Sequence, residues 1–179
     1  MDNIKLIKPC ERYLLSYLEA CRELKSADIT ANAFHNPDDF SEWKDNIFLR
    51  FEKNAKGVNL PEGYVPMTTY WLVGDENYIG SGSIRHYLNE NLKKFGGHIG
   101  YFIRPKYWNM GYGTLQLKLL LEKAHGLGID TALLTCDVGN PASARIMEKN
   151  GGKRIDEIEV EVAGTLRKLY RYEIKTISV

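Results

Sequence analysis

One change of hydrophobic period, within residues 97–127, restricts the fold more than any other feature of this chain. Residues 97–103 alternate as in a β-strand, and Pro105, which has no N–H group to donate, ends that pattern. From Gly113 onward, apolar residues recur at the spacing of one helical face. The sequence therefore predicts a strand that passes into a helix through a loop with glycines at positions 111 and 113. The expected buried helical face comprises Gly113, Leu117, Leu120 and Ala124, with Leu119 and Leu121 beside it.

The loop between this strand and helix has the composition of an anion-binding site. A helix start exposes unpaired backbone N–H groups and the positive end of the helix dipole. Gly111 and Gly113 have no Cβ atom, so a ligand can approach these amides closely. The sequence therefore predicts a site for phosphate or pyrophosphate. It excludes the dinucleotide fingerprint, because Gln116 occupies the position of the third glycine, and no Gly-Lys-Ser/Thr follows for a P-loop.

The loop resembles a motif of a known family. Gly111 and Gly113 match the R/Q-x-x-G-x-G/A loop of the GNAT N-acetyltransferases, in which backbone amides hold the pyrophosphate of coenzyme A (CoA). Trp108 departs from the motif, because the family has Arg or Gln at that position. Residues 84–88, 96–101 and 148–152 look like a bacterial branch of predicted acetyltransferases without a settled substrate. The resemblance implies acetyl-CoA as the cofactor, bound by Phe102, Ile103, Arg104, Trp108, Asn109, Met110, Gly111, Tyr112, Gly113, Thr114, Asn140 and Ser143.

The order of the predicted elements also resembles that of the GNAT family. It implies an α/β (α+β) fold with a mixed, mostly antiparallel sheet flanked by helices, in a single domain over residues 1–179. It also implies that strands 97–103 and 131–136 run parallel and splay apart, which leaves a slot between them. We expect strands over residues 4–8, 67–73, 78–88, 97–103 and 131–136, a hairpin over 155–174, helices over 11–24, 41–51, 113–127 and 140–150, and a loop over 89–97.

Asn140 and Ser143 provide the second signal for a cofactor site. Asn140 precedes Pro141 and is a good helix N-cap, which explains its identity without any ligand. In GNAT enzymes an Asn at this place contacts the pantetheine arm, and a Ser in the next helix approaches the thioester sulfur. The resemblance therefore implies that Asn140 and Ser143 meet the cofactor. The two interpretations of Asn140 are compatible, because a cap side chain can lie at the mouth of a slot.

The residues that move protons are less clear from the sequence. The usual tyrosine acid of the family is replaced by Met147, seven residues after Asn140, so Ser143, Tyr101 or water must serve the leaving thiolate. His98 is the first candidate for the base that takes the proton of the amine, because histidine titrates nearest pH 7. A lone histidine on a strand is also readily structural. The other candidate bases are His86, Glu90 and Asp137.

Basic and aromatic side chains around the predicted slot have two interpretations each. The basic ones meet CoA phosphates or face solvent, and they are Arg104, Lys106 and Arg145. The aromatic ones shape an acceptor pocket or pack in the core, which is the default for large apolar side chains. These aromatic residues are Trp43, Tyr70, Trp71 and Tyr87.

Composition limits the partners of the chain. A net charge of about +1 gives no sign of nucleic-acid binding. No apolar stretch approaches the roughly 18 residues of a membrane span, and the N-terminal residues lack the apolar region of a signal peptide. The cysteines lack metal-ligand spacing, which predicts no metal site and reduced thiols in a cytoplasmic protein.

The sequence thus predicts an N-acetyltransferase that transfers acetyl from acetyl-CoA to a primary amine of a small molecule or peptide by direct attack. Two alternatives stay open, a non-catalytic acyl-CoA-binding sensor, which Met147 makes credible, and a protein-interaction module on the same fold. A homodimer is a further expectation, because the hairpin over 155–174 has apolar side chains on both faces and needs cover on both. Helices within residues 25–63 could supply the same cover.

Overall fold

The computed structural model describes residues 3–26, 47–162 and 164–176. Of the helix expected over residues 41–51, only the part from Ile47 lies within the described residues, where it belongs to α3 (Ile47–Lys56). Trp43, which we expected in an acceptor pocket or in the core, lies outside the described residues.

The strands form two antiparallel sheets. The first has the order β1 (Ile4–Ile7), β2 (Met67–Gly74), β3 (Asn77–Arg85), β4 (Ile99–Ile103). The second has the order β5 (Thr131–Asp137), β7 (Thr165–Lys175), β6 (Lys153–Val162). The predicted α+β fold, with antiparallel sheets flanked by helices, is confirmed. The single sheet that we expected is instead divided between β4 and β5.

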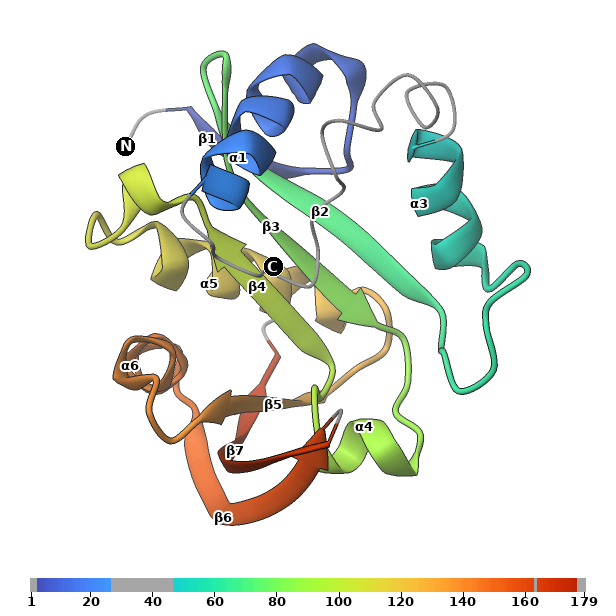
Figure 1. Ribbon diagram of the computed structural model, residues 1–179, viewed down its shortest axis with the longest axis vertical. Helices are drawn as coiled ribbons and strands as arrows, with labels where there is room; N and C mark the ends of the chain where they lie inside the picture. The colour runs from blue at the N-terminus through green and yellow to red at the C-terminus, as the bar shows by residue number, and fades with distance from the viewer. Residues whose placement is uncertain (1–2, 27–46, 163, 177–179) are drawn as a thin grey trace.

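Helices cover both faces of the first sheet (Figure 1). The turn η1 (Glu11–Tyr13) and α1 (Leu14–Ser26) pack with α3 on one face, and α5 (Tyr112–His125) packs on the other. The turn η3 (Pro105–Tyr107) connects β4 to α5, and α6 (Pro141–Lys149) follows β5. The stretch over 89–97, which we expected to be a loop, contains the short helix α4 (Glu90–Lys94). Asn89 caps this helix by accepting a hydrogen bond from the Leu92 N–H at 2.9 Å.

The apolar face of α5 builds the core beneath the site. Leu117, Leu120 and Ala124 are fully buried, as their helical spacing predicts. The helix lies so close to β3 that a Cβ atom at Gly82 would stand 2.4 Å from Leu120 Cδ1. On the other face, Trp71 is fully buried and stacks on Tyr17, with 4.7 Å between ring centroids. Tyr70 is also buried and belongs to the core, whereas Tyr87 is exposed.

Gln116 on α5 leads to a prediction about stability. Its side chain is fully buried, and among the described residues neither its Oε1 nor its Nε2 has a hydrogen-bond partner. Gln116→Met keeps a similar volume and removes the polar amide, so we expect it to raise the free energy of unfolding by about 1 kcal/mol. Urea denaturation measures this change. Gln116→Ala is the control, because it opens a cavity and should lower stability. A Gln116→Met protein less stable than the original would show that the amide has a partner.

Candidate functional site

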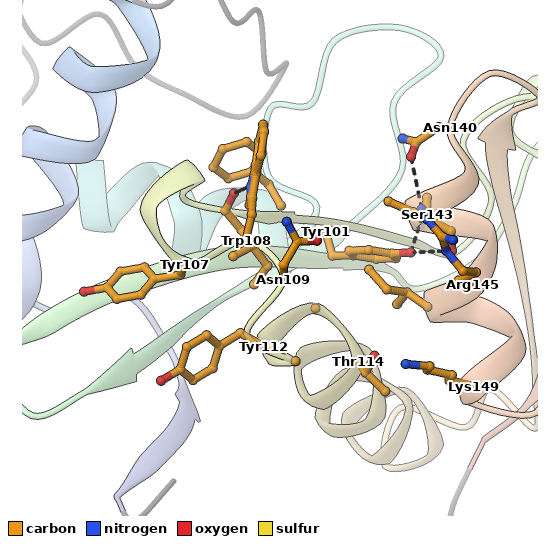
Figure 2. A pocket seen from close by; sticks show the side chains of 16 residues that line it. Tyr101, Tyr107, Trp108, Asn109, Tyr112, Thr114, Asn140, Ser143, Arg145 and Lys149 are labelled. Carbon is orange, nitrogen blue, oxygen red and sulfur yellow. Dashed lines mark hydrogen bonds between the residues drawn. The ribbon is translucent and has the colours of Figure 1, made fainter.

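A cavity of about 750 Å³ lies between the end of β4, the loop into α5 and the first turns of α6 (Figure 2). Strands β4 and β5 lie close together near the start of β4, and they separate toward the side where α6 lies (Figure 1). The cavity opens on that side. It is lined by Tyr101, Phe102, Ile103, Tyr107, Trp108, Asn109, Gly111, Tyr112, Gly113, Thr114, Asn140, Ala142, Ser143, Arg145, Ile146 and Lys149.

The start of α5 forms the cavity wall that the glycine pattern predicts. Gly111 is the N-cap and has a φ of 84°, a left-handed conformation that favours glycine. The Leu115 N–H is bonded to the Gly111 carbonyl at 3.2 Å, so the N–H groups before it lie at the open helix end. A Cβ atom at Gly113 would stand 2.6 Å from Ile146 Cδ1 on α6. The structure therefore explains why glycine occupies both positions: the backbone conformation requires it at Gly111, and the lack of space for a side chain requires it at Gly113.

Trp108 binds the last backbone carbonyl of β4 with its side chain. Its Nε1 donates to the Ile103 carbonyl at 2.6 Å, and half of the residue remains exposed. On the other edge of β4, the Arg104 N–H donates to the Ile79 carbonyl of β3 at 2.9 Å. Because backbone groups of a strand alternate between its two edges, those of Ile103 and Tyr101 face away from β3, toward the cavity. With the Ile103 carbonyl bonded to Trp108, the Ile103 N–H and the Tyr101 backbone groups face the cavity.

Two hydroxyl groups meet inside the cavity. Tyr101 Oη lies 2.8 Å from Ser143 Oγ and 3.3 Å from the Ser143 carbonyl oxygen, so the ring of Tyr101 spans from β4 to α6 (Figure 2). Asn140 Oδ1 accepts from the Ser143 N–H at 3.0 Å, which confirms its role as helix cap. Burial raises the pKa of Tyr101, and this outweighs the opposite effect of the Ser143 hydrogen bond. Tyr101 therefore remains a hydroxyl donor at neutral pH.

Met147 does not take part in this site. It is buried in the core cluster on the inner face of α6, and Tyr101 packs against the same cluster. The polar group that the family carries on α6 is thus absent from this position, and a hydroxyl from β4 is present in the cavity instead.

The basic side of the cavity is formed by α6. Arg145 and Lys149 lie one helical turn apart and both line the cavity (Figure 2). Sequence reasoning weighed Arg145 but missed Lys149, although the four-residue spacing from Arg145 places them on one helical face. It also missed three further residues that line the cavity, Tyr107, Ala142 and Ile146.

All of the predicted cofactor ligands line this cavity except Arg104 and Met110. The expectation for Arg104 is wrong, because its side chain is 1% exposed and points to α1. There its Nε and Nη2 each donate to a carboxylate oxygen of Glu23 at 2.5 Å, and this bonding lowers the pKa of Glu23. Met110 is half exposed in the loop and does not line the cavity. Lys106 is also outside the lining, with its Nζ 5.1 Å from the centre of the Tyr107 ring.

The geometry of His98 contradicts its predicted role as a base. The ring Nδ1 of His98 accepts a hydrogen bond from the backbone N–H of Leu133 at 2.9 Å, and the backbone N–H of His98 donates to the Leu133 carbonyl at 2.7 Å. A backbone N–H can only donate, so Nδ1 carries no proton and Nε2 of the neutral ring carries it. Neither nitrogen then has a free lone pair for the proton of an amine. His98 also does not line the cavity.

The other candidate bases lie outside the cavity as well. His86 Nε2 lies 2.8 Å from Thr68 Oγ1 in the first sheet. Asp137 accepts two hydrogen bonds from Arg167, and Glu90 pairs with Lys93 on exposed helix α4. None of these groups is therefore placed to receive a proton in the cavity.

Among the described residues, two further kinds of site are absent. No three of their His, Cys, Asp and Glu side chains gather as metal ligands. None of the helices within these ranges has the length and apolar character that crossing a membrane requires.

The fold and cavity define a class of α+β protein with a splayed strand junction, a glycine-bearing helix start and a basic wall. The model of the acetyltransferase (GNAT) domain matches residues 18–153, whereas no curated protein matches the chain. The chain belongs to the GNAT acetyltransferase family.

Solved structures of acetyltransferases share this fold. The microcin C7 self-immunity acetyltransferase MccE, in complex with acetyl-CoA and AMP, has a TM-score of 0.70 at 16% identity, covering 99% of this chain and 94% of that one. RimL, a ribosomal L7/L12 α-N-protein acetyltransferase in complex with CoA, has a TM-score of 0.64 at 14% identity, covering 98% of this chain and 95% of that one. A spermidine N-acetyltransferase SpeG chimera from Vibrio cholerae and hSSAT has a TM-score of 0.63 at 15% identity, covering 98% of this chain and 96% of that one. At these identities the likeness shows the fold.

Proposed function

We propose that this protein is an acetyl-CoA-dependent N-acetyltransferase that acts on a primary amine of a small molecule or peptide. The observation that supports this best is the cavity itself, in which the open end of α5 and the Tyr101–Ser143 pair line the same space. The first feature suits the phosphates of a nucleotide, and the second suits a leaving group at the other end.

The residues present fit the cofactor. Gly111, with a φ of 84°, and Gly113, whose Cβ position is occupied by Ile146 Cδ1 at 2.6 Å, leave the start of α5 without side chains at these two places. We assign the pyrophosphate to the N–H groups at the start of α5, with Arg145 and Lys149 as basic partners. The pantetheine arm would pair with the backbone edge of β4 at Tyr101 and Ile103, in the manner of an added strand.

Acetyl-CoA supplies an activated acetyl group whose thiolate leaves when an amine attacks. We assign to Ser143 Oγ a hydrogen bond to that sulfur, and to Tyr101 Oη a hydrogen bond to Ser143 Oγ that strengthens it as a donor, which the 2.8 Å contact between the two hydroxyls supports. Asn140 orients Ser143 through the helix cap. Because the candidate bases lie outside the cavity, we assign removal of the amine proton to water. Positioning then supplies most of the rate enhancement.

The proposal that the acceptor is a primary amine is supported by the described activities of structural neighbours. The structural neighbours include proteins described as spermidine and protein N-terminal acetyltransferases, which share an amine acceptor. The alternative candidates are a non-catalytic acyl-CoA sensor and an interaction module, and both are compatible with Met147 in the core.

One pair of measurements separates the three candidates. Calorimetry with CoA should show binding for the enzyme and for the sensor. Release of free CoA thiol from acetyl-CoA, measured with a panel of polyamines, amino acids and peptides, should occur only for the enzyme. Absence of CoA binding by the folded protein would exclude both.

We also propose a single domain over residues 1–179, a cytoplasmic location and a homodimer. The cytoplasmic location is supported by the described cysteines, which are all free thiols. The dimer is supported by the β6–β7 hairpin, on which the apolar side chains of Ile155 and Leu166 are 45% and 66% exposed. Sedimentation at micromolar concentration tests it, and a monomeric mass would exclude a stable dimer.

A further inference from the structure

The two sheets are joined at the start of β4 by an unusual set of hydrogen bonds. His98 N–H donates to the Leu133 carbonyl of β5 at 2.7 Å, and Leu133 N–H donates back to His98 Nδ1 at 2.9 Å. Beside them, the Gly96 N–H donates to Thr135 Oγ1 at 3.1 Å. In an ordinary ladder a backbone carbonyl accepts the bond that His98 Nδ1 accepts here. An imidazole therefore replaces a backbone group at the junction.

This junction lies where β4 and β5 begin to separate. A few residues further along β4, Tyr101 and Ile103 line the cavity, and beyond the end of β5, Asn140 and Ser143 line its opposite wall. The strands diverge from the junction toward that cavity (Figure 1). The relative position of the two walls, including the 2.8 Å contact between Tyr101 and Ser143, thus depends on how firmly the junction holds.

The groups around His98 favour its neutral form. Arg85 of β3 donates to the Gly96 and Gly97 carbonyls at 3.1 and 2.9 Å, beside the imidazole. Burial, and then the charge of Arg85, lower the pKa of His98 from its ordinary value. On β7, Glu173 lies opposite Leu133 in the strand register. Other charged groups on the neighbouring elements are Arg171 on β7, which pairs with Asp156 and donates to the Lys93 carbonyl, and Lys94 at the end of α4.

We propose that His98 is a positioning residue whose neutral imidazole completes the β4–β5 junction and thereby holds the two walls of the cofactor slot in place. Protonation places a hydrogen on Nδ1, so two donors then face each other and the bond from Leu133 is lost. The slot loosens in acid as a result. This inference rests on the proposed function in treating the slot as the site of CoA.

Affinity for dephospho-CoA at pH 8 and at an acid pH below the folded pKa of His98, which NMR titration locates, tests this role. Dephospho-CoA is the probe because it lacks the phosphate monoester of CoA, which titrates near neutral pH. The original protein should bind it two- to tenfold more weakly at the acid pH, the change that one hydrogen bond supplies. His98→Asn should show no such loss, because its Oδ1 can accept from Leu133 and does not titrate. His98→Leu should bind weakly at both pH values, and His86→Asn should behave as the original protein.

Two readouts do not depend on binding. Nitrogen NMR of His98 should show a proton on Nε2 at pH 8. The stability contributed by the lowered pKa should be present above the unfolded value of 6.5 and be lost as pH falls through the lower folded value. His98→Asn should lack this loss. A proton on Nδ1, or an unchanged pH dependence in His98→Asn, would overturn the inference. No binding of CoA at pH 8 by the original protein would instead overturn the proposed function.

Discussion

Replacing Gly111 or Gly113 with valine should weaken CoA binding by more than tenfold, which corresponds to about 1.4 kcal/mol. At Gly111 the φ of 84° is unfavourable for a β-branched residue, so the turn that presents the α5 amides would change. At Gly113 a side chain would meet Ile146, whose Cδ1 lies 2.6 Å from the Cβ position, so valine there would displace the Ile146 side chain, which lines the cavity. Calorimetric titration of each folded variant with CoA measures the loss.

Gly128, beyond the other end of α5, offers a matched control. Its φ is 81°, and a Cβ atom there would meet nothing within 4 Å. Gly128→Val therefore introduces the same kind of backbone strain as Gly111→Val, away from the cavity. It should lower stability and leave CoA affinity unchanged. If Gly111→Val and Gly113→Val were folded and bound CoA as tightly as the original protein, the assignment of the pyrophosphate to the start of α5 would be wrong.

The strand, loop and helix around residues 97–127 were predictable because each depends on neighbouring residues. Alternation defines β4, Pro105 ends it, and helical spacing defines the buried face of α5. The same holds for Asn140, which caps α6 through Ser143, only three residues later. Local chemistry thus located the cavity and most of its predicted wall.

The failures concern side chains whose partners are distant in the sequence. Arg104 bonds to Glu23, 81 residues away, and a strand pattern does not tell which face meets α1. His98 accepts from Leu133, 35 residues away, so its tautomer could not be inferred from the sequence. Helix α4 was missed for another reason, since its five residues include a single apolar one, Leu92, which defines no helical period.

The departures from the family motif have local substitutes in the structure. Trp108 replaces a polar side chain, and its indole donates to the Ile103 carbonyl at the end of β4. Met147 replaces a tyrosine and fills the core, while the hydroxyl of Tyr101 reaches α6 from the opposite strand. Taken alone, Met147 in place of the family's tyrosine favours a non-catalytic protein. The presence of Tyr101 and Ser143 in one cavity favours an enzyme, and it can be tested separately.

Tyr101→Phe and Ser143→Ala should each lower turnover by about 10²-fold or more, at the lower end of the range for a general acid. Each removes one hydroxyl of the pair that we assign to the leaving thiolate. Because Tyr101 acts through Ser143, the double variant should lose little more than either single variant. CoA affinity should change little, since the phosphate contacts assigned to α5 and α6 remain. Single-turnover rates with a reactive amine, measured with CoA affinity, provide the data.

Tyr172→Phe is the matched control for this experiment. The Tyr172 hydroxyl donates to Glu148 Oε1 at 3.0 Å and lies outside the cavity lining, so its loss should leave turnover near the original value. Turnover should also not fall in alkali until the raised pKa of Tyr101 is approached, because only the protonated hydroxyl can donate. Folded Tyr101→Phe and Ser143→Ala enzymes with normal single-turnover rates would show that the thiolate leaves without help from these two hydroxyls. In that case, positioning of the amine by the slot would account for the rate enhancement.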